Sequence, residues 1–173
     1  MTIPRRPRVV RAFALLAPVL VLATAAASAA VADFEAGNRA YADRDYDTAF
    51  KEWLPLAQAG DPMAQNNIGF MYRKGRGVPL NETEAVKWYR RAAEQGFPEA
   101  MTNLGYMYDE GRGVEQDLVE SYKWFLLAAE RGREGADGHL EVLKNEFLTP
   151  EQVAEAERRA AAWTPVPEQA EGD

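Results

Sequence analysis

Apolar residues recur three or four positions apart over most of the chain, which predicts amphipathic helices rather than strands. The first clear set consists of Ala64, Ile68, Met71 and Tyr72. The pair Asp61-Pro62 before this set favours a helix start, because Asp caps a helix well and Pro suits its first position. Gly75 after it favours a left-handed helix end. The pattern therefore predicts a helix between Asp61 and Gly75.

A second helix is predicted directly afterwards. Its apolar face consists of Ala85, Trp88, Ala92 and Ala93. The stretch Asn81-Glu82-Thr83-Glu84 resembles a capping box and favours a helix start, while Gly96 favours its end. Gly77 in the short connection allows the chain to turn back. The two stretches together predict a helix hairpin.

This hairpin repeats with a shift of 36 residues, and nearly half of the positions in 61–96 are identical in 97–132. The loop Gly75-Arg76-Gly77-Val78 recurs as Gly111-Arg112-Gly113-Val114. The second copy has Pro98 near its first helix start and the capping-box sequence Asp117-Leu118-Val119-Glu120 before its second. A fixed period of this length is typical of a helical-repeat array. Gly69 and Gly105 are mid-helix, where glycine costs about 1 kcal/mol relative to alanine, so they predict the close approach of another helix.

Partial units flank the two complete repeats. Residues 33–60 lack the glycine loop and resemble an ordinary tetratricopeptide helix pair. In 133–164 a helical face continues through Ala136, Leu140 and Leu143. The capping box Thr149-Pro150-Glu151-Gln152 then predicts a final helix from Glu151 to Trp163 that caps the array. Residues 165–173 are expected to form a disordered tail.

The first 32 residues have the layout of a secretory signal peptide. Four arginines lie within the first 11 positions, followed by an apolar run from Ala12 to Ala30 and small residues up to Ala32. We expect cleavage between Ala29 and Asp33 and a periplasmic or secreted protein. The alternative is an uncleaved sequence that anchors the protein in the inner membrane, facing the periplasm.

The composition excludes several kinds of site. The chain has no cysteine and one histidine, His139, so thiol nucleophiles, disulfides and Cys/His zinc sites are excluded. His139 has no obvious partner in the sequence and is expected to be solvated or to cap a helix. The formal net charge is −7, which disfavours nucleic acid and anionic lipid surfaces. We expect no catalytic residue, metal site or cofactor.

These motifs resemble the Sel-one-like repeat, a relative of the tetratricopeptide repeat. The resemblance is carried by the Gly-Arg-Gly-Val loops, the alanines and tryptophan that follow them and the closing glycine, and it covers about 33–164. It implies an all-α, right-handed α-solenoid of antiparallel helix pairs that serves protein–protein interaction. Some secreted relatives are cysteine-rich and linked to β-lactam binding, and the missing cysteines argue against that activity. Other periplasmic relatives inhibit sensor-kinase signalling.

Twelve residues are expected to form the structural core of the repeats. The four tryptophans are interpreted as core wedges between units, rather than as an aromatic binding stripe. The expected core residues are Trp53, Gly69, Tyr72, Gly75, Gly77, Trp88, Gly105, Tyr108, Gly111, Gly113, Trp124 and Trp163.

The first helix of each pair lines the concave face in arrays of this kind, so the resemblance also implies a binding groove. Phe70 and Tyr106 are equivalent and would form an aromatic strip, while Arg73-Lys74 gives way to Asp109-Glu110. The alternative is that these side chains only form solvated helix faces. Asn67 and Asn103 would hold either a ligand backbone or the neighbouring helix. The expected groove residues are Asn38, Tyr41, Asn66, Phe70, Arg73, Lys74, Thr102, Tyr106, Asp109 and Glu110.

We therefore expect an exported, non-catalytic scaffold or adaptor that binds a protein or peptide of the cell envelope as a monomer. One alternative has the same fold and is a periplasmic regulator or inhibitor of an envelope sensor or cell-wall enzyme. Another is an envelope enzyme acting on peptidoglycan or β-lactams, but the sequence shows no activated nucleophile or metal cluster for it.

Overall fold

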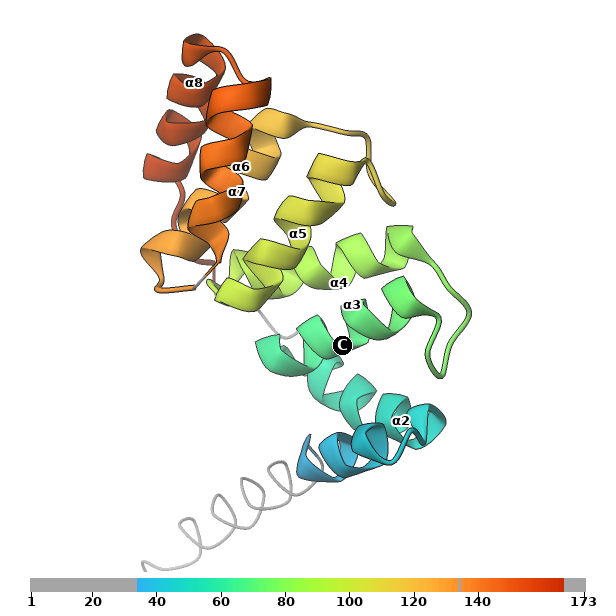
Figure 1. Ribbon diagram of the computed structural model, residues 1–173. Coiled ribbons are helices and arrows are strands. Elements are labelled where there is room, and N and C mark those ends of the chain that lie inside the picture. Colours follow the sequence, from blue (N-terminus) through green and yellow to red (C-terminus); the bar gives the residue numbers. More distant parts are fainter. Residues whose placement is uncertain (1–33, 134, 167–173) are drawn as a thin grey trace, which may run out of the picture.

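The computed structural model describes residues 34–133 and 135–166, and this part of the chain is helical without strands. The expected signal peptide and most of the expected tail lie outside the described residues. A helix over 34–42 comes first (Figure 1). It is followed by α2 (Tyr46–Gln58), α3 (Pro62–Lys74), α4 (Glu82–Glu94), α5 (Pro98–Glu110), α6 (Leu118–Glu130), α7 (Ala136–Val142), the π-helical turn η1 (Leu143–Phe147) and α8 (Pro150–Ala161).

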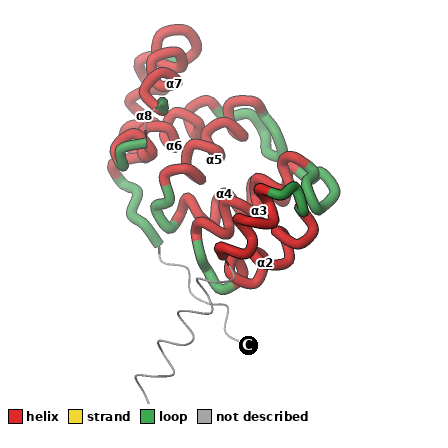
Figure 2. The backbone as a smooth tube through the Cα atoms, turned by 60° about the horizontal axis from the view of Figure 1, so that its bottom comes forward, coloured by secondary structure: helices red, strands yellow, loops and turns green. Residues whose placement is uncertain are grey.

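Consecutive helices pack against each other from α2 to α7, as expected for a solenoid in which each unit covers the next. The long loops of the two complete units, which join α3 to α4 and α5 to α6, lie on the same side of the array (Figures 1 and 2). The fold class expected from the sequence is confirmed.

Side-chain caps fix the predicted helix starts. Asp61 accepts a hydrogen bond from the Ala64 amide at 2.7 Å, and Asn81 accepts one from Glu84 at 3.1 Å. Thr149 and Gln152 form the predicted capping box in full.

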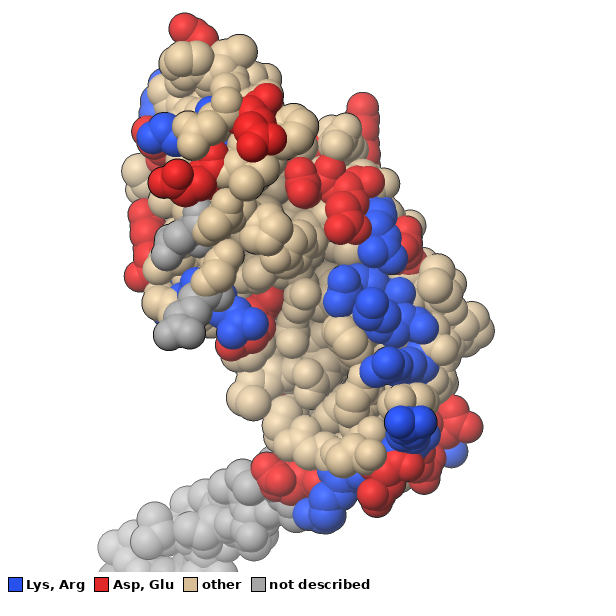
Figure 3. All heavy atoms as spheres, viewed as in Figure 1, with Lys and Arg blue, Asp and Glu red and all other residues tan. Residues whose placement is uncertain are grey.

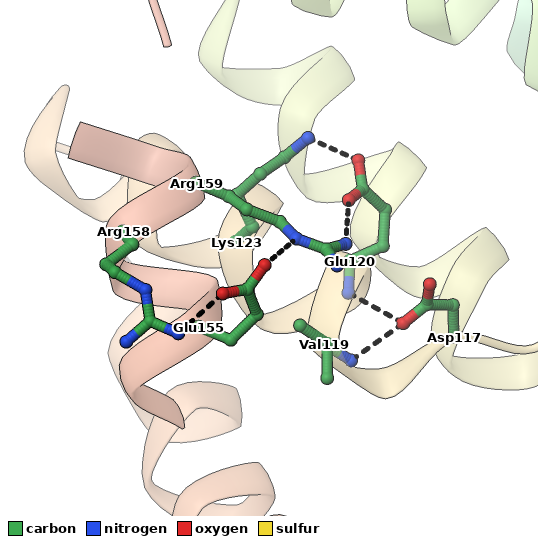
Figure 4. Close-up of polar contacts among 7 residues, drawn as sticks. All are labelled: Asp117, Val119, Glu120, Lys123, Glu155, Arg158 and Arg159. Atoms are coloured by element: carbon green, nitrogen blue, oxygen red, sulfur yellow. Dashed lines mark hydrogen bonds and ion pairs between the residues drawn. The ribbon is translucent and has the colours of Figure 1, made fainter. Parts of the chain in front are cut away.

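The other two predicted capping boxes are only half formed. Asp117 caps α6 through the amides of Val119 and Glu120, both at 3.0 Å (Figure 4). The Glu120 carboxylate is turned away from its own helix start, because it binds Lys123 one turn later and also contacts Arg159 of α8. Glu84 likewise binds Lys87 at 2.6 Å. Both glutamates therefore stabilise helix surfaces instead of completing a cap.

The glycine loops pack against the preceding unit, which explains their composition. Gly75 and Gly111 end their helices in the left-handed region, each with φ of 63°. A Cβ atom on Gly77 would lie 2.5 Å from the carbonyl oxygen of Tyr46, and one on Gly113 would lie 2.2 Å from that of Glu82. The second glycine of each loop therefore lets two backbones meet at the start of the preceding unit's second helix.

In each of the first three units, a glycine on the first helix faces a large ring on the second. A Cβ atom would lie 2.3 Å from Trp53 if built on Gly37, 2.8 Å from Tyr89 if built on Gly69, and 3.1 Å from Phe125 if built on Gly105. Tyr89 and Phe125 are fully buried, and Trp53 is nearly so. The predicted close approach at Gly69 and Gly105 is thus confirmed, and the partner is the aromatic ring of the same hairpin.

The tryptophans do not form one equivalent set, and they are not all buried core residues as expected. Trp53 is equivalent to Tyr89 and Phe125, which follow it at steps of 36 residues. Trp88 lies one position earlier in the helix, is only half-buried, and carries the Arg91 guanidinium 4.6 Å above its ring. The expected core residues Tyr72, Tyr108 and Trp163 are also half-buried.

Trp124 is buried although its counterpart Trp88 is not. Its ring lies 6.2 Å from that of Trp163, at the end of the chain's described part. The difference arises because α8 packs against α6, whereas within the described residues no additional helix packs to a comparable extent against α4.

The last unit departs from the repeat. Its first helix is short and passes into η1, with Ala136 and Leu143 buried and Leu140 half-buried. The final helix ends at Ala161 rather than at Trp163. The expected disordered tail also begins too early, because Val166 donates a backbone hydrogen bond of 2.8 Å to the carbonyl of Glu94.

Candidate peptide-binding groove

The helix over 34–42, α2 and α3 together form a pocket of about 320 Å³. Four residues expected in the groove line it. The complete lining is Asn38, Tyr41, Trp53, Asn66, Asn67 and Phe70. The pocket combines aromatic surface with three amide side chains, which both donate and accept hydrogen bonds. Such a lining suits an apolar side chain and the polar backbone around it.

Two asparagines link neighbouring units at the edge of this pocket. Asn103 Nδ2 donates to Asn66 Oδ1 at 2.9 Å, between α5 and α3. Of the two roles considered for Asn103, the structure therefore supports that of holding the neighbouring helix. Asn67 is half-buried and lines the pocket itself.

Three cations surround the ring of Phe70. The Arg73 and Arg76 guanidinium carbons lie 5.2 and 5.7 Å from the ring centroid, and the Lys74 ammonium lies 6.0 Å from it. These distances are within the range of cation–π attraction. Arg76 also donates a hydrogen bond to the hydroxyl of Tyr41, which lines the pocket. Arg76 was not expected in the groove, because the sequence presented it only as part of the loop.

The α5 residue equivalent to Phe70 is Tyr106, and its surroundings differ from those of Phe70. The hydroxyl of Tyr106 lies 2.7 Å from His139 Nε2, and the His139 ring stacks on Phe125 at 5.1 Å. The expectation that His139 is solvated or a cap is therefore wrong, because it is half-buried and bonded to a side chain. His139 follows Asn103 by 36 residues, so extending the repeat into the last unit would have indicated its contact with the preceding helix.

The remaining expected groove residues on α5 either form a hydrogen bond within their own helix or belong to an acidic surface. Thr102 Oγ1 donates to the Pro98 carbonyl within its own helix at 3.0 Å. Burial raises the pKa of the Asp109 carboxyl, and the adjacent Glu110 raises it further. Glu110 also accepts a bond from Arg112 at 3.1 Å. These residues do not line the pocket at Phe70.

The charges on this face are separated as the sequence suggested. Figure 3 shows basic side chains gathered over the end of α3 and the loop after it, and acidic side chains over the end of α5. A ligand along the groove would thus meet positive charge first beside the pocket and negative charge one unit later.

Neither a metal centre nor a membrane span is found in the described ranges. Residues 34–133 and 135–166 contain no group of three or more His, Cys, Asp or Glu side chains placed to hold a metal ion. None of the helices in these ranges has the length and apolar character needed to cross a bilayer.

Comparison with known proteins agrees with this architecture. The Sel1 repeat family matches residues 62–97 and 98–132. A structure of a protective antigen present in uropathogenic Escherichia coli strains, described as displaying an SLR fold, aligns with a TM-score of 0.72 and 29% identity. The alignment covers 78% of this chain and 29% of that one.

Two further proteins are similar to this chain. A Sel1 repeat protein from Oxalobacter formigenes aligns with a TM-score of 0.63 and 36% identity, over 77% of this chain and 55% of that one. The chitin synthase regulator SKT5 of Saccharomyces cerevisiae is 40% identical over 50 residues, which are 29% of this chain and 7% of that protein. The chain thus spans only a small part of this curated relative. The chain therefore contains two Sel1 repeats, and its fold is similar to that of these two solved structures.

Proposed function

We propose that this protein is an exported, non-catalytic adaptor that binds a protein of the cell envelope in the groove over α3 and α5. Sel1 repeats are in general protein-interaction modules, and the groove is the surface that this chain offers for the purpose. The observation that carries the proposal is the pocket at Phe70. It brings together four groove residues that lie up to 32 positions apart in the sequence.

The chemistry of the pocket favours a peptide over a reactive small molecule. Its lining offers amides and aromatic rings but no carboxylate, imidazole, amine or thiol. Aromatic side chains provide large contact area at low entropic cost and are enriched at binding hot spots. The pocket is therefore suited to anchor one side chain of a longer segment.

The test is capture of an envelope partner with purified full-length protein, compared with the double variant Phe70→Ala and Tyr106→Ala. The double variant should lose capture and retain its helical circular dichroism spectrum. Because Tyr106 also bonds His139, each single variant is measured too. Loss should follow Phe70→Ala, since only Phe70 lines the pocket. A folded double variant that captures the partner at wild-type affinity would place binding elsewhere.

Export is proposed on the sequence of residues 1–32. The arginine-flanked apolar run and the small residues after it support cleavage between Ala29 and Asp33. N-terminal sequencing of the protein from cells tests this. A chain that still begins at Met1 or Thr2 would favour an anchored protein facing the periplasm.

A regulatory role is the second candidate, and the relative SKT5 favours it, since that protein is named as a regulator of chitin synthase. In this regulatory role, the protein would bind an envelope sensor or cell-wall enzyme through the groove and inhibit it. Adding the purified chain to the captured partner and measuring the partner's activity separates regulation from passive scaffolding. Labelling the chain with a fluorescent penicillin tests the remaining possibility of β-lactam chemistry, and we expect no labelling.

A further inference from the structure

Arg76 and Arg112 occupy the same place in the two complete repeats, but their surroundings differ. Arg112 is held by two carboxylates. Its Nε donates to Glu82 at 2.7 Å, and another guanidinium nitrogen donates to Glu110 at 3.1 Å. A guanidinium paired in this way has its charge neutralised within the protein.

Neither carboxylate has an acidic counterpart at the equivalent position near Arg76. The residues 36 positions before Glu82 and Glu110 are Tyr46 and Lys74. The Arg76 guanidinium carbon lies instead 5.2 Å from the Tyr46 ring centroid, and the Arg76 side chain donates to the hydroxyl of Tyr41. Among residues 34–133 and 135–166 we find no ion pair for Arg76. The repeat here therefore exchanges an ion-paired arginine for one held by aromatic rings and a tyrosine hydroxyl.

Arg73 and Lys74, next to Arg76, likewise contact an aromatic ring and form no ion pair within the described residues. Arg73 and Lys74 contact the Phe70 ring, and Arg73 Nε is buried with no hydrogen-bond partner in the described ranges. Several cations elsewhere in the described residues are, by contrast, paired with acids. These are Lys87, Arg112, Lys123, Arg133, Arg158 and Arg159.

We propose that Arg73, Lys74 and Arg76 bind the carboxylates of an extended acidic segment of a partner protein, with an apolar side chain of that segment in the pocket at Phe70. This inference rests on the proposed function and specifies its ligand. Arginine suits carboxylates because its planar fork donates two parallel hydrogen bonds. Aromatic rings on one side keep water from the half-buried Arg76, so a carboxylate arriving from the groove meets a poorly screened charge.

The location of the charges supports an acidic partner. The whole chain has a formal net charge of −7, so its general field repels acidic peptides. A local basic cluster beside an aromatic pocket then selects for a segment that can place its acids and its apolar side chain together.

The first test uses the full chain and a fluorescent peptide with two glutamates on each side of a phenylalanine. A matched peptide has glutamines in place of the glutamates. Fluorescence anisotropy should show that the acidic peptide binds about tenfold more tightly than the neutral one, and that salt reduces this difference. Equal affinities, or no binding of either peptide at millimolar concentration, would overturn the inference.

The second test changes the protein. Lys74→Glu gives Arg76 the kind of neighbour that Glu110 gives Arg112, so it should satisfy Arg76 internally and weaken acidic-peptide binding about tenfold or more. Arg76→Gln should weaken it similarly. Lys87→Glu makes the same change in net charge as Lys74→Glu but lies on α4, and Arg112→Gln removes the paired arginine. Both controls should bind the acidic peptide as the wild type does.

The outcomes separate this inference from the groove proposal. If Phe70→Ala weakens both peptides while Lys74→Glu and Arg76→Gln weaken neither, the groove stands and the carboxylate site is overturned. A peptide of residues 167–173, which contains three acids, is also titrated. Tighter binding of that peptide would assign the site to this chain's own acidic segment and overturn the assignment to a partner. Weaker binding supports the partner.

Discussion

Gly113 lies against the backbone of Glu82, so closely that a Cβ atom on the glycine would stand 2.2 Å from the Glu82 carbonyl oxygen. Backbone atoms cannot swing away as a side chain can. The contact joins the loop of one repeat to the start of the preceding repeat's second helix. It therefore fixes the spacing between neighbouring units.

Gly113→Ala should destabilise the protein by about 3 kcal/mol, because it adds this clash to the strain of alanine at positive φ. Chemical denaturation measures the loss. Gly132→Ala is the matched control, since Gly132 also has positive φ, of 77°, but has open space around it. That variant should lose only about 1 kcal/mol. Equal losses would show that the interunit contact contributes nothing.

Tyr89→Phe should leave the free energy of unfolding unchanged or raise it by about 1 kcal/mol. The Tyr89 hydroxyl is buried with no hydrogen-bond partner in the described part of the chain, and leaving such a group unsatisfied is costly. The next repeat already has phenylalanine at this position, at Phe125. Thermal and chemical unfolding would measure the change. A clear loss of stability would indicate that the hydroxyl interacts favourably with the nearby Arg73.

The raised pKa of Tyr89 predicts that the protein loses stability at alkaline pH. Burial raises the pKa of Tyr89 from 10.0 to about 12. A folded-state pKa above the unfolded one gives a stabilisation that is complete below pH 10 and is lost as pH rises towards 12. Burial also raises the pKa values of Tyr106, Tyr108 and Tyr122. Unfolding measured between pH 9 and 12 should therefore show a falling free energy, with a smaller slope in Tyr89→Phe. An unchanged slope would contradict the assignment to Tyr89.

Trp124→Ala should cost about 3–5 kcal/mol, as expected for a buried aromatic side chain. Trp88→Ala should cost about half as much, because this ring packs against the core but stays half-buried. Urea denaturation of the two variants compares positions that the sequence alone makes equivalent. Equal losses would mean that the extra helix α8 adds nothing to the burial of Trp124.

The sequence was sufficient to predict the repeat fold, because the glycines and caps that set it act locally. Gly75, Gly111, Asp61 and Asp117 determine their helix ends through neighbours within four residues. The register of Trp53 was harder to recognise. Its hairpin lacks the glycine loop, so Gly37 precedes Gly69 by 32 residues, whereas Trp53 precedes Tyr89 by 36.

The candidate site was predicted only in part, for a different physical reason. Asn38, Tyr41, Asn66 and Phe70 were expected because, in the arrays that this chain resembles, the first helix of each pair lines the concave face. Helix periodicity then indicates which side chains of that helix share this face. The state of Arg76 depends on contacts between units, such as the one with Tyr41 35 residues away. No local pattern reveals whether such an arginine meets an acid or an aromatic ring.

The backbone hydrogen bond between Val166 and Glu94 affects how the array unfolds. In a simple solenoid each unit touches only its neighbours, so terminal units can fray one at a time. Here the residues after α8 reach past the third unit to the end of the second helix of the second, and Trp163 contacts Trp124 and Arg131 on the way. Opening the last helix therefore disturbs the middle of the array, which makes the carboxyl-terminal half unfold more cooperatively than a linear stack would.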